Sequence, residues 1–341
     1  MLRNRDIAEL LARAGEEAEG HARRALRRAS RAALSWPVEA ATLIENDRLT
    51  TLARVGPYIA RRIREWLEAD APVPEPPPLR RDFLTLAEAR AMLAGNPEWP
   101  RSLRGDLQVH TVWSDGTGTI EEMAEAAIRR GHDYVAITDH TRTLRIAGGL
   151  DEGRLAAQGE EIDAVNARLG GRLRLLRAAE MNLAPDGTGD MPHAALDRLD
   201  LMLGAFHSAL RRRDDQTARY VAALENPDVH VLAHPRGRIY DFRAGLAADW
   251  ARVFGVAAEL DKAVEIDAYP DRQDLDVERL RLAAAAGVRI SIGSDAHHTD
   301  QLGAIDLGVA VACRAGIAPQ RIVNFLSADD LVAWAAALHG R

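Results

Sequence analysis

The chain has 341 residues, of which 47% are hydrophobic, and this length is sufficient for two domains. Its net charge of −7 excludes a surface that is basic all over for nucleic acid, although a local basic face remains compatible with it. No apolar run approaches the ~20 residues that span a bilayer, and the charged start is not a secretory signal, so we expect a cytoplasmic protein with no membrane contact. The single cysteine, Cys313, excludes an internal disulfide and a cysteine-based zinc site.

The first 70 residues are expected to form an all-α domain. Apolar residues recur there at helical spacing, as in Ile7, Leu10 and Leu11, and no alternating β-branched run interrupts them. The proline-rich stretch 71–78 suits neither a helix nor a strand and predicts an extended linker. We therefore expect a helical domain over residues 1–70, a linker with a connecting helix over 71–100, and a second domain over 101–341.

From about residue 103, short apolar runs alternate with stretches of helical periodicity. Segments such as 120–130, 155–169 and 277–286 carry helix-forming residues between these runs. Repeated βα units predict an α/β fold around a parallel sheet, either open or closed into a barrel. The strand-like runs are residues 107–109, 134–138, 173–178, 201–206, 229–233, 263–266 and 288–292.

A histidine or an acid follows nearly every one of these strands. A single histidine after a strand is more often a hydrogen-bonded loop residue than a ligand, but five of the 11 histidines fall just past a strand. Parallel α/β folds place function at the carboxyl ends of the strands, and acids gathered there repel one another unless cations neutralise them. Imidazole and carboxylate together suit zinc, manganese or iron. The candidate ligands are His110, Asp115, His140, Glu180, His207, His234, Asp295 and His297.

These residues and their surroundings resemble the PHP (polymerase and histidinol phosphatase) superfamily over residues 100–335. The resemblance implies a distorted (βα)7 barrel that holds two or three divalent metal ions. Its motifs occur together and in order, as Gly105-Asp106-Leu107-Gln108-Val109-His110 with Ser114-Asp115-Gly116, then Ile137-Thr138-Asp139-His140, Glu180, Phe206-His207-Ser208, His234-Pro235 and Ser294-Asp295-Ala296-His297.

The same resemblance implies how the ligands divide among the metals. The family usually opens with His-x-His, whereas Gln108 stands at the first of these positions. A glutamine oxygen binds metal less strongly than imidazole, so we expect the first site to be weaker or to be completed by water. Glu180, His207 and Asp295 are the residues expected to act in catalysis. The implied ligand sets are His110, Glu180 and Asp295 for the first metal, Glu180, His207 and His234 for the second, and Asp115, His140 and His297 for the third.

Within the superfamily, the likeness is closest to the PHP domain of bacterial family X DNA polymerases. It is carried by residues 138–145 with 148–151, and by 184–190, 265–272 and 295–302, while residues 1–70 resemble the small helical domain of those enzymes, with a helix-hairpin-helix over 52–63. Only about 30 residues separate the two regions, which is too few for a polymerase palm, so polymerase activity is excluded. The only lysine, Lys262, lies outside the helical domain, which leaves Schiff-base lyase chemistry unsupported.

Arginines supply candidate groups for binding anions. In the hairpin, Gly56 would expose backbone N–H groups at a helix N-terminus to a DNA phosphate, and Arg61 and Arg62 would add positive charge. Ordinary solvated arginines in an arginine-rich chain would give the same pattern. The candidates for holding phosphate oxygens near the strand ends are Arg142, Arg145 and Arg236.

The predicted reaction is hydrolysis of a phosphoester by metal-activated water. Three hypotheses for the substrate remain open. The hairpin favours DNA 3′ ends, with 3′-5′ exonuclease or 3′-phosphatase activity, and the acidic net charge favours a small-molecule phosphatase of the histidinol-phosphatase type. The departure at Gln108 motivates the third, a non-catalytic DNA-binding protein with a vestigial metal site.

Overall fold

The computed structural model describes residues 1–338, and the chain divides into two compact units. The first unit consists of Met1–Asn96 with Ile239–Ala244, and the second begins with Pro97–Arg238 and resumes at Gly245. Residues 71–96 therefore belong to the first unit, while the expected domain limits at 70 and 100 stay a prediction. Over residues 1–338, none of the helices is both long and apolar enough to cross a bilayer.

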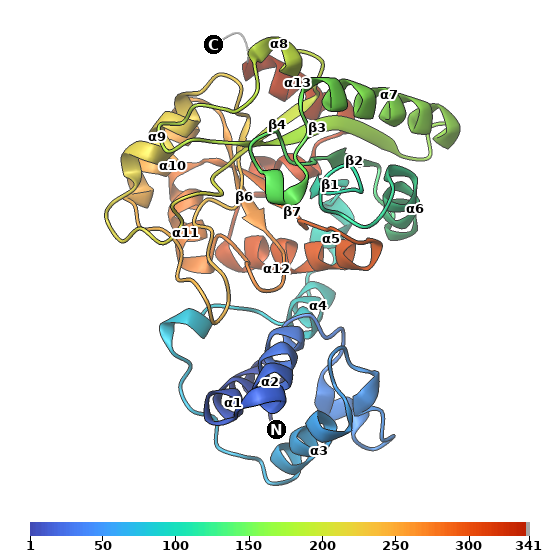
Figure 1. The fold of residues 1–341 in the computed structure, drawn as a ribbon, viewed down its shortest axis with the longest axis vertical. Helices are drawn as coiled ribbons and strands as arrows, with labels where there is room; N and C mark the ends of the chain where they lie inside the picture. The colour runs from blue at the N-terminus through green and yellow to red at the C-terminus, as the bar shows by residue number, and fades with distance from the viewer. Residues whose placement is uncertain (339–341) are drawn as a thin grey trace. The chain divides into compact units, whose positions relative to one another are not determined.

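The first unit is helical, which confirms the prediction for the N-terminal region (Figure 1). Helices α1 and α2 pair through faces that bury Leu11 and Leu26 completely, and Trp36 fills the same core while its indole N–H donates to the Ala53 carbonyl at 3.0 Å. Short 3-10 helices precede α3 and α4. The α-helices are α1 (Asn4–Glu17), α2 (Gly20–Ala33), α3 (Pro57–Glu68) and α4 (Leu86–Ala94).

The second unit is built around one sheet of seven parallel strands in the order β1-β2-β3-β4-β5-β6-β7, with helices on its outside (Figure 1). Each strand is buried along most of its length, as expected when both faces of a parallel sheet are covered. The strands are β1 (Gly105–Val109), β2 (Tyr134–Ile137), β3 (Arg174–Asn182), β4 (Leu201–Ala205), β5 (Val231–Leu232), β6 (Ala263–Asp267) and β7 (Arg289–Gly293).

The sheet curls so far that its two edge strands meet and close a barrel. A parallel bridge joins Val109 to Ala296, just past β7. Beneath it, the buried Asn324 side chain accepts from the Ile292 N–H at 2.7 Å and donates to the Gly105 and Ile292 carbonyls at 2.9 and 2.7 Å. One amide side chain thus takes the place of ladder hydrogen bonds at the seam, and the predicted (βα)7 barrel is confirmed.

Several helices of this unit begin or end at capping residues in the sequence. Thr119 and Glu122 form a reciprocal capping box at the start of α6, and Asp151 caps α7 through the Arg154 N–H. Gly131 ends α6 at φ 81°, a conformation that favours glycine. The helices are α5 (Glu98–Ser102), α6 (Ile120–Arg130), α7 (Glu152–Leu169), α8 (His193–Leu196), α9 (Thr217–Glu225), α10 (Trp250–Glu259), α11 (Val277–Ala286), α12 (Ile305–Ala315) and α13 (Ala328–Leu338).

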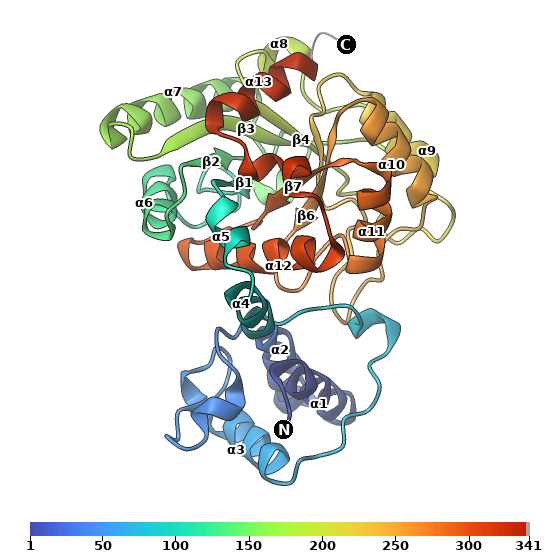
Figure 2. The same cartoon turned by 180° about the vertical axis from the view of Figure 1, so that it is seen from behind.

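The barrel interior is apolar toward the amino ends of its strands, where helix α13 covers it (Figure 2). Leu107, Leu176 and Leu203 form part of this core, and Leu331 of α13 packs against it. The Trp334 indole N–H donates to the carbonyl of Asp261, two residues before β6 begins, at 3.0 Å. Because α13 closes this end, the carboxyl ends of the strands are left for the polar residues.

Candidate metal centre

Glu180 is the hub of the polar cluster at the carboxyl ends of the strands. It lies on β3 and is completely buried. Its Oε1 lies 2.6 Å from His234 Nε2 and 3.2 Å from His207 Nε2, while its Oε2 lies 3.0 Å from His140 Nδ1. His110 Nε2 follows at 3.4 Å from Oε2. A single carboxylate therefore faces four imidazoles, delivered by the ends of β1, β2, β4 and β5.

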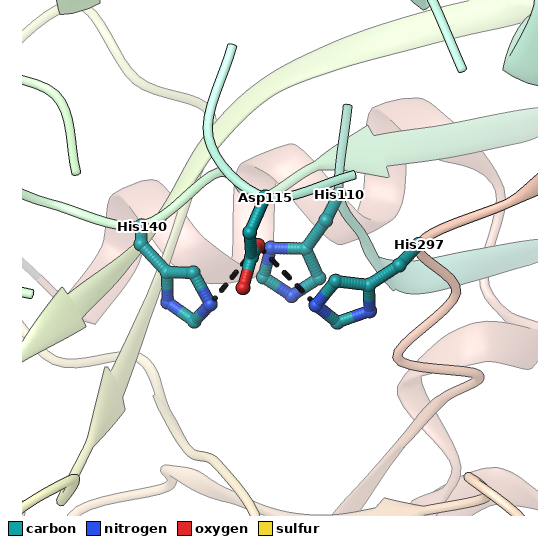
Figure 3. A group of neighbouring side chains, drawn as sticks. All are labelled: His110, Asp115, His140 and His297. Carbon is teal, nitrogen blue, oxygen red and sulfur yellow. Dashed lines mark ion pairs between the residues drawn. The ribbon is translucent and has the colours of Figure 1, made fainter. Parts of the chain in front are cut away.

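A second group gathers around Asp115 in the loop after β1. Figure 3 shows His140 and His297 reaching Asp115 from its two sides. Asp115 Oδ1 lies 3.5 Å from His140 Nε2 and 3.3 Å from His297 Nε2. The His110 ring stacks against both imidazoles, with centroid distances of 4.5 and 4.3 Å. Gly116 brings the loop close, because a Cβ there would meet the His110 carbonyl oxygen at 2.6 Å.

Several buried polar atoms of this cluster have no hydrogen-bond partner. They are both ring nitrogens of His110, Nδ1 of His140 and Oε2 of Glu180. Buried polar groups are nearly always hydrogen-bonded, so such a set needs an explanation. Ligand atoms that lie close together without forming hydrogen bonds suit shared divalent cations. The donor set present therefore fits metal ions.

Two residue groups have ligand atoms within 4.8 Å of one another. One comprises His110, Asp115, His140 and His297, and the other comprises His140, Glu180 and His207. His140 belongs to both, because its two ring nitrogens face Glu180 and Asp115 respectively.

The protonation of the cluster follows from these contacts. Burial lowers the pKa of His110 and His207, which leaves both imidazoles neutral and ready to act as ligands. Burial also opposes the charge on His234 and His297, but Glu180 and Asp115 respectively outweigh it and raise each pKa to about 9. These two protons must leave when a metal binds, so metal affinity is expected to rise with pH.

Two of the candidate ligands have a left-handed backbone. The φ angle is 24° for His234 and 52° for Asp295, although neither residue is glycine. Such conformations cost of order 1–3 kcal/mol each and concentrate at functional sites, where the surrounding structure imposes them. Both residues directly follow the strand region, so the bend turns each side chain back over the barrel mouth.

Asp295 is engaged by an arginine that we did not single out from the sequence. Arg272 Nη1 lies 2.5 Å from Asp295 Oδ2 and 3.6 Å from Asp267 Oδ2. The other oxygen of Asp295 lies 3.1 Å from His110 Nε2. The Arg272 side chain is 33% exposed, so part of it reaches solvent while its charge is held at the centre. Its only sequence signal is its place within the motif segment 265–272.

Gln108, the departure from the His-x-His pattern, is completely buried on β1. With its amide nitrogen oriented toward β6, Gln108 donates to Oε1 and Oε2 of Glu265 at 2.5 and 2.9 Å. Glu265 also accepts from the His234 backbone N–H at 2.7 Å. Gln108 therefore has a protein partner, which the sequence pattern alone does not reveal.

Two further residues hold the centre without belonging to the predicted set. Asn182, at the end of β3, places its Oδ1 3.0 Å from His207 Nδ1, so the Nε2 of that ring is the nitrogen directed at Glu180. Asp139 accepts from the Thr111 N–H at 2.8 Å and from Ser114 Oγ at 2.5 Å, which fixes the loop that carries Asp115. Asp139 lies within the quoted motif, whereas Asn182 has no signal beyond its position two residues after Glu180.

The three arginines proposed for phosphate binding lie in different surroundings. Arg142 is exposed and pairs with Glu152, and Arg145 lies exposed in the short helix Arg145–Ala147. Arg236 is 8% exposed, and its Nη1 lies 2.6 Å from Asp276. Their role in binding phosphate stays a prediction.

The hairpin residues of the first unit lie at the start of α3. Gly56 is the N-cap of this helix and is exposed, as is Arg61, while Arg62 is half-buried over the Trp66 ring at 5.1 Å. Before the turn, the chain forms only the 3-10 helix Leu49–Thr51. Arg54, where many such hairpins carry glycine, has a φ of 63°. DNA binding by these residues also stays a prediction.

Comparison with known proteins gives matches over part of the chain. A family model described as "PHP domain" matches residues 106–266. The "DNA polymerase/3′-5′ exonuclease PolX" of Bacillus subtilis is 37% identical over 233 residues, which are 68% of this chain and 41% of that protein. This chain thus spans less than half of the length of that relative. A "probable phosphatase" of Acetivibrio thermocellus is 30% identical over 212 residues, which are 59% of this chain and 82% of that protein.

Among solved structures, the histidinol phosphate phosphatase of Lactococcus lactis, complexed with zinc, L-histidinol and phosphate, aligns with a TM-score of 0.48. The two chains are 14% identical, and the alignment covers 63% of this chain and 95% of the other.

Proposed function

The chain belongs to the PHP family, and from that premise we propose that its metal centre hydrolyses phosphoesters at DNA 3′ ends, as a 3′-5′ exonuclease or a 3′-phosphatase. That it is a metal-dependent phosphoesterase follows from the family and from the ligand clusters at the barrel mouth. The observation that carries the proposal is the buried Glu180 carboxylate, which faces imidazoles from four strands while its Oε2 has no hydrogen bond.

Divalent metals bound by these residues supply Lewis acidity and bring the pKa of a bound water toward neutrality. Glu180 would hold metal together with His140 and His234, because its two oxygens face these two histidines. Asn182 holds the tautomer of His207 that presents Nε2 to the centre. Arg272 keeps a positive charge beside Asp295 and is partly exposed, so it is placed to meet a phosphate oxygen.

The preference for DNA has two supports. The relative whose name includes 3′-5′ exonuclease is 37% identical over 233 residues, which are 68% of this chain. In the first unit, α2 exposes Arg23, Arg24, Arg27 and Arg28 and contains no acidic residue, so it offers a basic face despite the negative net charge of the chain. Together they favour a polyanionic substrate.

A small phosphate ester is the second candidate substrate. This candidate is favoured by the 30% identity to a "probable phosphatase". The alignment covers 82% of that protein but only 59% of this chain, so much of this chain has no counterpart in it. Under this hypothesis the barrel alone would carry the activity, and the helical unit would have another role.

The test is hydrolysis of a substrate panel with Mn²⁺ present. The panel contains 5′-labelled single-stranded DNA with a 3′-hydroxyl, the same strand with a 3′-phosphate, histidinol phosphate and 4-nitrophenyl phosphate. We expect shortening or 3′-dephosphorylation of the DNA by the wild-type chain, and loss of this activity in His207→Ala. His193→Ala is the matched control, because this histidine is 64% exposed on α8 and pairs there with Asp197 and Asp228.

The outcomes separate the hypotheses. Release of phosphate from histidinol phosphate, with no action on either DNA, would replace the DNA proposal with the small-molecule one. An inert chain on all four substrates, with metal bound, would support a vestigial centre and refute both.

A further inference from the structure

We propose that this centre holds two tightly bound metal ions, and that Gln108 and Arg272 close the third position that the PHP family pattern implies. The inference rests on the proposed function for the existence of a metal centre, but it concerns how many ions this chain holds and which residues decide the number.

The first step is the engagement of Gln108. In the family pattern this position offers an imidazole to the first metal, next to His110. Here the amide end of Gln108 lies 2.5 and 2.9 Å from Oε1 and Oε2 of Glu265, and both side chains are completely buried. With its nitrogen turned to that side, Gln108 donates to both oxygens. Because Glu265 also accepts from the His234 N–H, moving Gln108 would break a closed buried network. The glutamine therefore serves Glu265 and is a poor replacement for the missing imidazole.

The second step concerns the charge at Asp295, a ligand implied for the same metal. Arg272 Nη1 lies 2.5 Å from Asp295 Oδ2, which already neutralises this carboxylate. A divalent ion on Asp295 would lie close to the guanidinium, and like charges within a few ångströms in a buried site repel strongly. The arginine thus supplies the positive charge that a metal would otherwise bring.

The third step is where the remaining ligands converge. The two groups with mutually close ligand atoms contain His110, Asp115, His140 and His297 in one, and His140, Glu180 and His207 in the other. His234 joins the second group through its 2.6 Å contact with Glu180. Within residues 1–338, Asp295 belongs to neither group. His110, which the family pattern assigns to the first metal, lies with the group around Asp115.

The test measures metal content, which needs no assay of activity. The full chain is loaded with Mn²⁺ or Zn²⁺, freed of excess by gel filtration, and analysed by inductively coupled plasma mass spectrometry against protein concentration. We expect two ions per chain for the wild type. We expect three for Gln108→His combined with Arg272→Met, because the imidazole restores the missing ligand and the guanidinium that repels the ion is gone. Gln320→His adds a histidine at an exposed position and is expected to stay at two.

Arg272→Met gives a second route to the same answer. This variant removes the guanidinium but keeps an unbranched apolar side chain, so the Asp295 carboxylate becomes available to a metal ion. Titration calorimetry with Mn²⁺ is then expected to show a binding event that the wild type lacks.

Three ions in the wild type, with a fall to two in Gln108→Ala, would overturn the inference. A Gln108→His/Arg272→Met double variant that folds and still holds two ions would overturn it as well. Either result leaves the proposed function intact, whereas a chain that holds two ions but hydrolyses no phosphoester would refute the proposed function and leave this inference standing.

Discussion

The hydrogen bond between Asn182 and His207 gives the sharpest test of how the centre is held. His207 Nδ1 lies 3.0 Å from Asn182 Oδ1, and its Nε2 lies 3.2 Å from Glu180. Asn182→Leu keeps a side chain of similar size but removes the acceptor. The ring then loses the bond that selects its tautomer and fixes its orientation. Removing such a supporting bond typically costs about 10- to 100-fold in metal affinity or activity, equivalent to about 1.4–2.7 kcal/mol.

The assay is 4-nitrophenyl phosphate hydrolysis across a series of Mn²⁺ concentrations. We expect Asn182→Leu to lose about 10- to 100-fold in kcat/KM at limiting Mn²⁺, and to recover part of this loss at saturating Mn²⁺, because the defect lies in holding the metal. Asn182→Asp is the control, since it retains an acceptor for the His207 N–H and is expected to stay within a few-fold of the wild type.

Two results would refute this reasoning. One is an Asn182→Leu protein that is folded by circular dichroism and as active as the wild type at every Mn²⁺ concentration. The other is Asn182→Asp losing as much activity as Asn182→Leu, which would mean that the hydrogen bond to His207 is not the feature that matters.

Three further predictions concern stability, pH and DNA. Asn324→Ala leaves the Ile292 N–H and two carbonyls unpaired at the barrel seam, so urea unfolding is expected to show a loss of about 3 kcal/mol. His132 is buried, and burial lowers its pKa to about 4, so the unfolded chain binds more protons between pH 6.5 and 4 and stability is lost as pH falls through that window. His132→Leu should therefore gain about 2 kcal/mol relative to wild type between pH 7 and pH 5 in urea unfolding with a chelator present. Arg28→Gln, on the exposed face of α2, should lower the slope of log binding constant against log salt for single-stranded DNA by about 0.7 in fluorescence anisotropy.

Each of these has an outcome that contradicts it. Asn324→Ala within 1 kcal/mol of the wild type would mean that the seam does not depend on this side chain. Parallel pH profiles for His132→Leu and wild type would show that His132 keeps an ordinary pKa in the folded chain. Arg168→Gln, in the other unit, is the control for Arg28→Gln. If both variants keep the wild-type salt slope, Arg28 does not bind DNA, and α2 is not part of the DNA interface.

The barrel was predictable because its apolar runs are short and regularly spaced, but strand ends were not. β3 continues to Asn182, beyond the apolar run at 173–178, because Glu180 and Asn182 remain paired with Leu203 and Ala205 of β4. A buried glutamate and an asparagine break the apolar pattern, so only the pairing with the neighbouring strand reveals the extension. β5 is conversely only Val231–Leu232, since those two residues alone pair with both neighbours.

The site shows the same division between local and long-range information. The histidines and acids of the mouth could be named from the sequence because each lies near the carboxyl end of a strand or in the loop after it, and parallel strands deliver their ends to one rim. The acids that pair with Arg236 and Arg272 could not be named from the sequence, because each lies in a segment distant along the chain. Arg236 meets Asp276, 40 residues away, and Arg272 meets Asp295 from the loop after β6.

Four buried acids lie at the barrel mouth, and their charges differ according to their neighbours. They are Glu180, Glu265, Asp267 and Asp295. Burial by itself would raise the pKa of all four. At Glu180 the surrounding imidazoles outweigh this effect, and at Asp295 the guanidinium of Arg272 does, so the pKa of each of these two carboxyls lies below its usual range. Burial and the neighbouring Asp267 raise the pKa of Glu265 well above its usual range, and burial together with Asp295 raises the pKa of Asp267 to about 8. The mouth therefore has one side where histidines surround a carboxyl of lowered pKa, Glu180, and another side where burial raises the pKa of Glu265 and Asp267. Gln108 lies against Glu265 on this second side, where its neutral amide adds no charge beside a buried carboxyl.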